Sequence, residues 1–407
     1  MEAWLKISLL LSIFGFLRET KPSAPFITDF LVDFKDVTLD QVLRDVYPVG
    51  TYSYMVLAII AFLITDYFRY KPLIFISGIS GIITWSLFLW TQSLLGLQIA
   101  EVFYGVYLAT EVSYYTYIYA KVARSRYDSV TAHTRSAVFL GRFVGGALGQ
   151  ILVFTRLMNY KELNYLTLGT QVLCTFWVFL LPKVSSSVYF NRNENNNDER
   201  TSSALLWYHF KTSFSNIEVI QWSLWYAIGN CGFVQVTTYI QVLWNTIDND
   251  QDVIWNGAVE ALITLLSAVV TLFAEKIQNI LHLRSNSNVA ILSVLTSLEG
   301  LSLVLAAKTK ILYVSYVGYM LFCTLFAFTI TICSAALARK LEDDSFGLIF
   351  GINTFIALVM QSLLTVIVVS GNVLVLDAIQ QFYVYAGFYI VFALLYACYH
   401  IYSICKK

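Results

Sequence analysis

The chain has 407 residues, of which 58% are hydrophobic, 16% aromatic and only 13% charged. That apolar share exceeds what a soluble domain can bury, so the composition predicts a protein embedded in a lipid bilayer. The formal net charge is zero and no long block of like charge occurs, which argues against nucleic acid as a partner.

Apolar runs, taken in chain order, predict about twelve spanning helices, because each crossing needs roughly 20 apolar residues. The first run, residues 5–16, is followed by Arg18, Lys21 and Pro22 without a signal-peptide cleavage site, so we expect it to begin a first membrane helix. The predicted spans of the first half are 4–28, 50–68, 73–93, 97–121, 131–155 and 162–182. Those of the second half are 217–244, 253–276, 287–307, 311–337, 346–370 and 379–404.

A polar stretch at 183–215 divides the chain into an N-terminal six-helix half, 1–182, and a C-terminal six-helix half, 216–407. Its centre, residues 193–200, is too polar to pack and is expected to be flexible. Six spans, a polar loop and six more is the layout of the major facilitator superfamily, whose halves rock about a central site. The predicted fold class is therefore all-α and polytopic, and another twelve-helix architecture is the alternative on spacing alone.

Loop charges predict the orientation, because lysine and arginine accumulate in short cytoplasmic loops. One set of alternate loops is rich in both, whereas the other carries acids, notably within 29–45 and 248–252. Both termini and the central loop are therefore expected in the cytoplasm. The six cysteines form no CxxC pair and are predicted to be small buried hydrophobes.

Ionisable side chains at membrane depth are costly unless they are paired or face water, so each one is a functional candidate. Glu111 lies within the fourth predicted span, and Tyr114, three residues later, projects from the same side of that helix. Aromatic rings there would offer a cation or a flat heterocycle a stacking surface. The alternative role for Glu111 is an ion pair with Arg135, which shares one helix face with Arg142, and the two roles can coexist. Glu299 is expected to snorkel to the membrane interface.

For two further segments, the sequence allows either a functional role or a purely structural one. Asp66, Arg69 and Lys71 lie between the second and third spans, where they predict a gating or packing element, or else a plain positive-inside cluster. The small residues at 145–149 predict close helix approach rather than ligand contacts. No metal site, cofactor or enzyme is expected, because the histidines lack ligand spacing and no nucleophile motif occurs: His133, His209, His282 and His400.

Stretches spread over nearly the whole chain carry a family signal. They lie at 21–26, 47–54, 65–72, 110–119, 232–236, 239–244, 256–261 and 350–357, and include Tyr-Pro-Val-Gly-Thr-Tyr at 47–52 and Phe-Gly-Ile-Asn-Thr-Phe at 350–355. In these stretches the sequence resembles the reduced-folate and thiamine carriers, a family within the facilitator superfamily. The resemblance implies a vitamin carrier that works by alternating access.

The two main substrates of that family have opposite charge, a thiazolium cation and a folate dianion, so charges at the site should separate them. The resemblance implies an acid at the place of Glu111 in the thiamine branch and an arginine there in the folate branch. Gln361 also matches the thiamine branch, and Cys323 stands where folate carriers have an arginine. Tyr47 and Glu260 match the family. The departures from its pattern are Ala24, Gly50, Thr238 and Arg142.

We therefore expect a plasma-membrane transporter of thiamine or a related cationic heterocycle. Glu111 would be the charge partner, Tyr47 and Tyr114 the stacking walls, and Glu260 and Thr238 further substrate contacts. The supporting or gating residues would be Arg135, Asp66, Arg69 and Gln361. Folate is the alternative substrate, a non-transporting vitamin receptor is the further alternative, and a coupling ion or counter-anion is left open as an additional partner.

Overall fold

The computed structural model describes residues 3–68, 70–122, 126–184, 202–247, 254–280, 288–341, 346–370 and 373–405. Those ranges hold helices and short connections, with no strand among them. Nine of the helices in the described ranges are long and apolar enough to cross a membrane. The all-α membrane fold predicted from the sequence is confirmed.

The first set of helices packs as one group in which α1 contacts α8 and α9, while α6 contacts α4 and α5. Its helices are α1 (Ala3–Glu19), α4 (Tyr47–Tyr67), α5 (Lys71–Trp90), α6 (Leu94–Ala109), α7 (Glu111–Lys121), α8 (Tyr127–Phe154) and α9 (Tyr160–Trp177). In the second set, α13 contacts α14 and α16, and α11 contacts α14, α15 and α16. Its helices are α11 (Ile217–Ile247), α12 (Asn256–Ile280), α13 (Asn288–Lys308), α14 (Leu312–Ala338), α15 (Phe346–Val368) and α16 (Ala378–Cys405).

The first predicted span is shorter than the sequence suggested. Helix α1 ends at Glu19, and the chain turns through residues 20–23 into η1 (Ala24–Phe26) and the short helix α2 (Ile27–Phe34). Pro22 and Pro25 explain the difference, because proline lacks the amide hydrogen that a continuing helix needs. Residues 18–21 therefore lie at an interrupted helix end instead of inside a long helix.

The fourth predicted span is likewise two helices. Helix α6 ends at Ala109 and α7 begins at Glu111, with Thr110 between them. The Thr110 hydroxyl donates to the Val106 carbonyl at 2.7 Å, and the Tyr107 carbonyl accepts from the Arg18 guanidinium at 3.0 Å. A discontinuous helix of this kind frees main-chain groups and is a common feature of transporter binding sites.

The central segment also differs from its prediction. Residues 185–201, which include the polar stretch expected to be flexible, lie outside the described part of the chain. Residues immediately after it form α10 (Ser202–Phe214), which packs against α11 and α15. The stretch 183–215 therefore includes a helix of its own.

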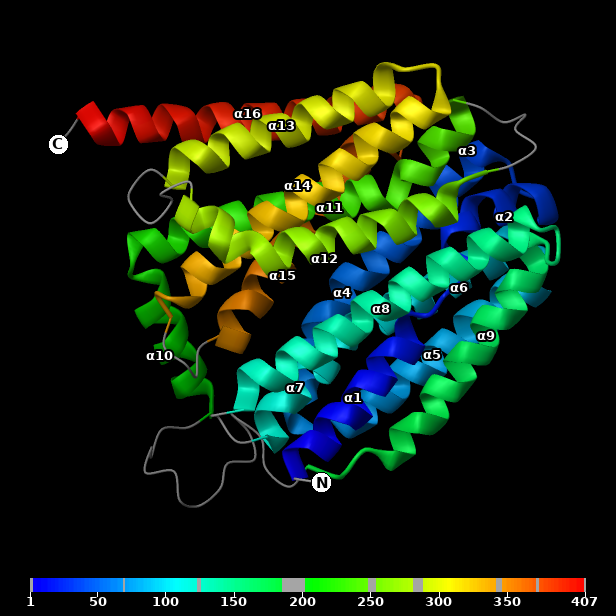
Figure 1. The fold of residues 1–407 in the computed structure, drawn as a ribbon, viewed down its shortest axis with the longest axis horizontal. Coiled ribbons are helices and arrows are strands. Elements are labelled where there is room, and N and C mark those ends of the chain that lie inside the picture. The colour runs from blue at the N-terminus through cyan, green and yellow to red at the C-terminus, as the bar shows by residue number, and fades with distance from the viewer. Residues whose placement is uncertain are drawn as a thin grey trace.

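The two sets of helices meet at the end of the bundle that carries α2, which we call the α2 end, and spread apart toward the end that carries the N-terminus (Figure 1). Hydrogen bonds join the two sets there: the Thr28 amide donates to Gln241 at 3.1 Å, and Gln241 donates to the Ala24 carbonyl at 3.0 Å. Arg44, from η2 (Val42–Val46), donates to the carbonyls of Val369 and Leu376 at 3.2 and 3.1 Å. The α2 end is thus closed by specific polar contacts.

Helices α8 and α12 form a close crossing between the two sets. A methyl group at Gly146 would lie 2.8 Å from the Gly257 carbonyl oxygen, and one at Gly257 would lie 2.7 Å from that of Gly146. A methyl group at Gly145 would lie 2.8 Å from the backbone nitrogen of Lys21. The small residues at 145–149 therefore allow close helix approach, as the sequence predicted.

Candidate substrate site

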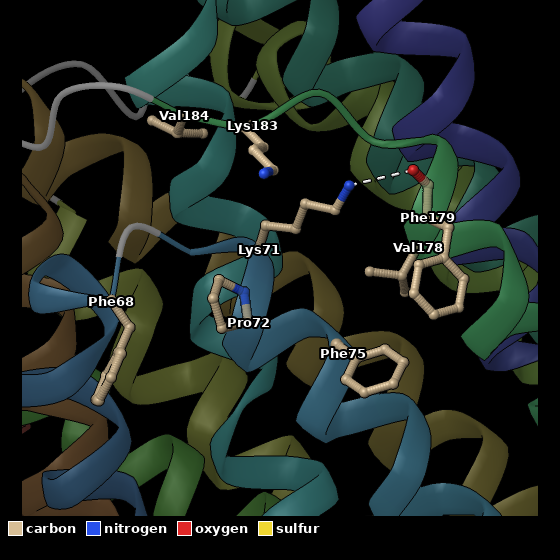
Figure 2. Close-up of a pocket in the computed structure, with 8 residues that line it drawn as sticks. All are labelled: Phe68, Lys71, Pro72, Phe75, Val178, Phe179, Lys183 and Val184. Carbon is tan, nitrogen blue, oxygen red and sulfur yellow. Dashed lines mark hydrogen bonds between the residues drawn. The ribbon is translucent and has the colours of Figure 1, made fainter.

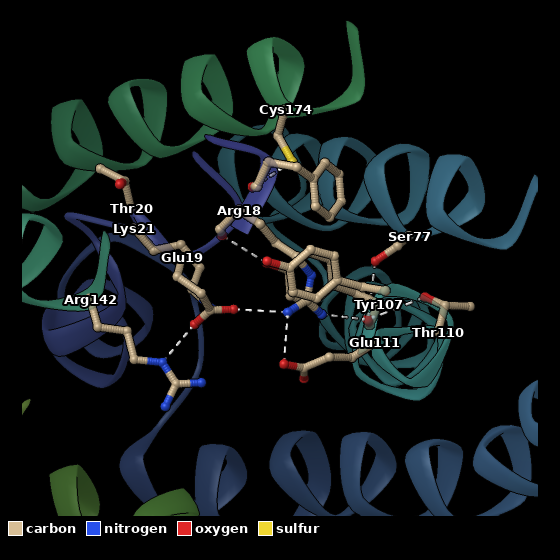
Figure 3. A network of polar contacts seen from close by, with 12 residues as sticks. Arg18, Glu19, Thr20, Lys21, Ser77, Tyr107, Thr110, Glu111, Arg142 and Cys174 are labelled. Atoms are coloured by element: carbon tan, nitrogen blue, oxygen red, sulfur yellow. Dashed lines mark hydrogen bonds and ion pairs between the residues drawn. The ribbon is translucent and has the colours of Figure 1, made fainter. Parts of the chain in front are cut away.

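Arg18 is the first member of a cluster of buried charges near the centre of the first helix set. One terminal nitrogen, Nη1, lies 2.9 Å from Glu19 Oε1 and 3.3 Å from Glu111 Oε1 (Figure 3). The other, Nη2, donates to the Tyr107 carbonyl at 3.0 Å, and the guanidinium lies over the Tyr107 ring at 4.2 Å from its centroid. Its side chain is 3% exposed, so these contacts compensate a charge removed from water.

Glu19 links the remaining cations. Its second carboxylate oxygen, Oε2, accepts from Arg142 Nε at 2.8 Å and lies 3.4 Å from Lys21 Nζ. We call the set Arg18, Glu19, Lys21, Glu111 and Arg142 the charge cluster. It contains three cations and two carboxylates, drawn from α1, the turn after it, α7 and α8.

Arg142 and Glu111 are the most exposed members of the charge cluster. The side chain of Arg142 is 50% exposed and that of Glu111 is 23% exposed, whereas that of Glu19 is 4% exposed. Arg142 lies in the middle of the candidate span Ser129–Phe154, on the side of α8 that faces α1 and α12. A charged side chain at this depth is tolerated when it faces a wet cavity, so Arg142 and Glu111 mark the accessible wall of the site.

The partner of Glu111 differs from the one expected. The sequence suggested Arg135, but the carboxylate pairs with Arg18, which the interrupted end of α1 places beside the start of α7. Arg135 is exposed on α8 and interacts electrostatically with Tyr226 of α11, in the second set. It therefore lies between the two helix sets instead of within the charge cluster.

The two predicted stacking tyrosines lie in packed surroundings. Tyr114 is buried, its hydroxyl donates to the Leu11 carbonyl at 3.0 Å, and its ring lies 5.3 Å from that of Phe14. Tyr47 is buried at the α2 end, where its hydroxyl shares a 2.6 Å hydrogen bond with Thr28 and its ring contacts that of Tyr239. In this conformation both rings pack against other side chains.

The predicted site residues of the second helix set lie on three of its helices. Glu260 on α12 is half-buried, accepts from the Tyr319 hydroxyl at 3.5 Å and interacts electrostatically with Arg142 across the two sets. Thr238 on α11 bonds to the Val234 carbonyl of its own helix at 2.7 Å. Gln361 on α15 is buried, and its side-chain oxygen has no hydrogen-bond partner among the described residues. The structure thus brings Glu260 and the charge cluster toward one another from opposite sets.

The predicted gating residues and Glu299 lie away from the charge cluster or outside the described residues. Arg69 and the side chain of Asp66 lie outside the described residues. Glu299 does not snorkel: it is fully buried on α13, where its Oε1 accepts from Thr329 Oγ1 at 2.7 Å. A polar partner on α14 therefore makes burial tolerable at that position.

Sequence reasoning missed the centre of the site. Arg18 and Glu19 fall within the predicted span 4–28, and the buried Glu101 falls within 97–121, so the rule on charges at membrane depth could have found all three. Glu101 approaches Gly50, where an added methyl group would collide with its carboxylate. Because Gly50 has no side chain, the Glu101 carboxylate can occupy the space beside it.

A separate pocket lies at the other end of the bundle, beside α5 and the segment that follows α9 (Figure 2). Lys71 Nζ donates to the Phe179 carbonyl at 3.1 Å, and most of the lining is apolar. The pocket shares no residue with the charge cluster. Lys71 is held by the main-chain oxygens of Phe179 and Leu181, so the pocket offers less for a polar solute than the cluster does.

Solved structures share this fold over almost the whole chain. The nucleoside transporter NupG matches with a TM-score of 0.67 and 14% identity, covering 96% of this chain and 99% of that one. A POT family transporter, PepTSo, matches with a TM-score of 0.70 and 12% identity over the full length of both chains. A D-xylose–proton symporter gives a TM-score of 0.68 at 12% identity, covering 97% of each chain.

The class that this fold defines is therefore an all-α membrane protein with a major-facilitator-like fold. Within that class the family model described as "Reduced folate carrier" matches residues 2–205 and 193–384, so the chain belongs to the reduced folate carrier family. The relatives include "Folate transporter 1" of Caenorhabditis elegans, 34% identical over 100% of this chain and 94% of that protein. They also include "Thiamine transporter 1" of Homo sapiens, 33% identical over 100% of this chain and 91% of that protein. The resemblance found in the sequence is confirmed.

Proposed function

We propose that this chain transports thiamine or a related cationic heterocycle across the plasma membrane by alternating access. The observation that carries the proposal is Glu111, a partly exposed carboxylate at a helix break within the bundle, in a chain that is 33% identical to a human protein named thiamine transporter. A carboxylate at this position can attract a cation and accept hydrogen bonds from an aminopyrimidine. Glu260 and Thr238 of the second helix set are assigned substrate contacts, and Arg135 of α8 and Gln361 of α15 are assigned supporting or gating roles.

The arrangement of the helices supports a conformation open toward the cytoplasm. Loop charges favour cytoplasmic termini, which makes the closed α2 end the outer end. The charge cluster would then be reached from the inside, between helix sets that spread apart away from α2 (Figure 1). Rocking of the two sets about the α8–α12 crossing would break the α2-end contacts and expose Glu111 to the outside.

Folate is the second candidate substrate, and the charge cluster itself favours it. The three cations Arg18, Lys21 and Arg142 exceed the two carboxylates around them, so the cluster has one positive charge in excess. That excess would suit a substrate with carboxylates. Another relative at comparable identity, "Folate transporter 1" of Caenorhabditis elegans, bears a name consistent with this alternative.

Uptake of radiolabelled thiamine and of radiolabelled folate by cells that express the chain distinguishes the two candidate substrates. We expect saturable thiamine uptake above that of untransfected cells. Glu111→Gln should lower it about tenfold, because a charge-assisted contact with the cation is lost. The matched control is Glu218→Gln, which removes an exposed carboxylate paired with Lys340 on the surface.

Three outcomes would contradict the proposal. Saturable folate uptake without thiamine uptake would make folate the substrate. Unchanged thiamine kinetics in Glu111→Gln would assign that residue to structure alone. Saturable vitamin binding without accumulation would instead identify a receptor.

A further inference from the structure

Glu299 is a buried carboxyl group that takes no part in the charge cluster. It lies in the second helix set, in the middle of the candidate span Ile291–Lys308, and it is 0% exposed. Among the described residues, no basic side chain forms an ion pair with it. An ionised carboxylate at this depth is costly without such a partner, so the form in which Glu299 is held requires an explanation.

The hydrogen bonds around Glu299 favour the protonated form of the carboxyl. The Thr329 hydroxyl oxygen lies 2.7 Å from Glu299 Oε1 and 2.7 Å from the Leu325 carbonyl oxygen. A hydroxyl group has one hydrogen, so Thr329 can donate to only one of these two oxygens at a time. A protonated Glu299 satisfies both contacts, because the carboxyl then donates to the Thr329 oxygen and the hydroxyl donates to Leu325.

The second oxygen of the carboxyl receives no hydrogen bond. Glu299 Oε2 has no partner in the described part of the chain, and neither has the Thr296 hydroxyl, which lies one turn earlier on α13. An ionised carboxylate has two oxygens that both require donors, whereas the neutral acid has fewer acceptor positions to satisfy. Burial with at most one hydrogen bond therefore favours the neutral acid.

The helices packed against α13 supply no charge for Glu299. On α16, Tyr389 is the titratable side chain that interacts electrostatically with it among the described residues. The Tyr389 hydroxyl donates to the Gly229 carbonyl at 3.1 Å, so its hydrogen is directed toward α11. The other titratable groups that act on Tyr389 are the thiols of Cys231 on α11 and Cys323 on α14.

Close helix packing shields this carboxyl from water. A methyl group at Gly300, the next residue of α13, would lie 3.0 Å from the Ala386 carbonyl oxygen of α16. On α14, a methyl group at Gly318 would lie 2.9 Å from the Ser302 carbonyl oxygen of α13. Both neighbouring helices thus approach the backbone of α13 closely, and Glu299 stays dry while they remain packed.

We propose that Glu299 is a buried proton-binding site, occupied in this conformation, and that the packing of α13 against α14 and α16 depends on the bound proton. The proton links Glu299 to Thr329 and keeps the carboxyl neutral at membrane depth. Its release would leave an unpaired charge between three helices, so hydration of this part of the second helix set would accompany release. The site is separate from the charge cluster and does not depend on which solute is transported.

Infrared difference spectroscopy of the detergent-purified full chain tests the protonation state. The readout is the carbonyl stretch of a protonated carboxyl group, identified by its shift to lower frequency in D₂O. We expect this band at neutral pH in the wild-type spectrum minus that of Glu299→Gln, because glutamine removes the carboxyl and keeps its shape. The matched control is Glu218→Gln, which removes an exposed carboxylate paired with Lys340 and should change carboxylate bands alone.

Variants of Thr329 test the hydrogen bond and remain informative if Glu299→Gln does not fold. Thr329→Val removes the oxygen that accepts from Glu299, so the protonated-carboxyl band should shift to higher frequency, whereas Thr329→Ser should keep its position. The control on the same helix is Thr331→Val, which removes a hydroxyl bonded to the Ala327 carbonyl at 2.6 Å. That variant should leave the band unchanged.

Thermal unfolding tests whether the packing depends on the proton. The folded chain holds a proton at Glu299 that the unfolded chain releases, so the contribution of this group to stability falls as the pH rises. Between about pH 6 and 9, the unfolding temperature of the wild type should therefore fall more steeply than that of Glu299→Gln.

Three results would overturn the proposal. A difference spectrum with carboxylate bands and no protonated-carboxyl band would show that Glu299 is ionised. An unchanged band in Thr329→Val would remove the hydrogen bond on which the site is built. Equal pH slopes of the unfolding temperature in the wild type and Glu299→Gln would show that the packing does not depend on the proton.

Discussion

Glu19 is the residue on which the charge cluster depends. Its carboxylate is 4% exposed and contacts Arg18, Arg142 and Lys21 at 2.9, 2.8 and 3.4 Å. Burial of a carboxylate carries a desolvation penalty that only close partners and good geometry offset. The same contacts offset part of the positive charge of these cations and fix the positions of Arg18 and Arg142.

Replacement of Glu19 tests that dependence. We expect Glu19→Gln to destabilise the protein by about 3–5 kcal/mol, because buried cations lose their common partner. The measurement is thermal unfolding of the detergent-solubilised protein. Glu218→Gln breaks an exposed ion pair with Lys340 and should cost about 0–1 kcal/mol. Equal unfolding temperatures for the two variants would show that Glu19 does not hold the cluster together.

At the scale of elements, α2 joins the two helix sets through Asp29. Its carboxylate is buried and accepts from Asn245 of α11 at 3.1 Å and from Asn256 of α12 at 3.3 Å. Burial raises the pKa of this carboxyl from its usual 3.8 to about 7, against the opposing effect of the Asn245 hydrogen bond. The titratable groups that face it among the described residues are Asp33 on α2, Tyr47 on α4, Tyr160 on α9 and Tyr316 on α14.

The raised pKa predicts that closure of the α2 end depends on pH. Opening would hydrate Asp29 and return its pKa toward 3.8, so the closed state binds the proton more tightly. Its contribution to closure is then complete below pH 3.8 and is lost as pH rises through about 7. We expect Asp29→Asn to flatten the dependence of the initial uptake rate on external pH between about 5.5 and 8.

The control for this pH effect is Asp40→Asn, which removes an exposed carboxylate on α3 (Leu39–Gln41). That variant should keep the wild-type pH profile. A profile that is unchanged in Asp29→Asn would rule out Asp29 as the group that titrates.

At the scale of the whole molecule, the lengths of the apolar runs were sufficient to predict an all-α membrane fold, because membrane spans must be long, apolar and internally hydrogen-bonded. Interruptions within spans were harder to predict. The prolines at 22 and 25 end α1 early, and the break at Thr110 sets the direction of Glu111, which decided that its partner is Arg18 instead of Arg135. Spacing along one helix placed Tyr114 beside Glu111, but the packing of α1 against α7 buried that ring. Such contacts join segments about a hundred residues apart, and they cannot be predicted from the pattern of residues along a single sequence.

The most direct test of the account is counterflow by the purified chain in liposomes. Vesicles loaded with unlabelled thiamine are diluted into a solution that contains a trace of labelled thiamine. Alternating access predicts a transient accumulation of label above equilibrium that is lost in empty vesicles and reduced in Glu111→Gln. Binding that saturates at about one molecule per chain, with no accumulation inside the vesicles, would contradict transport.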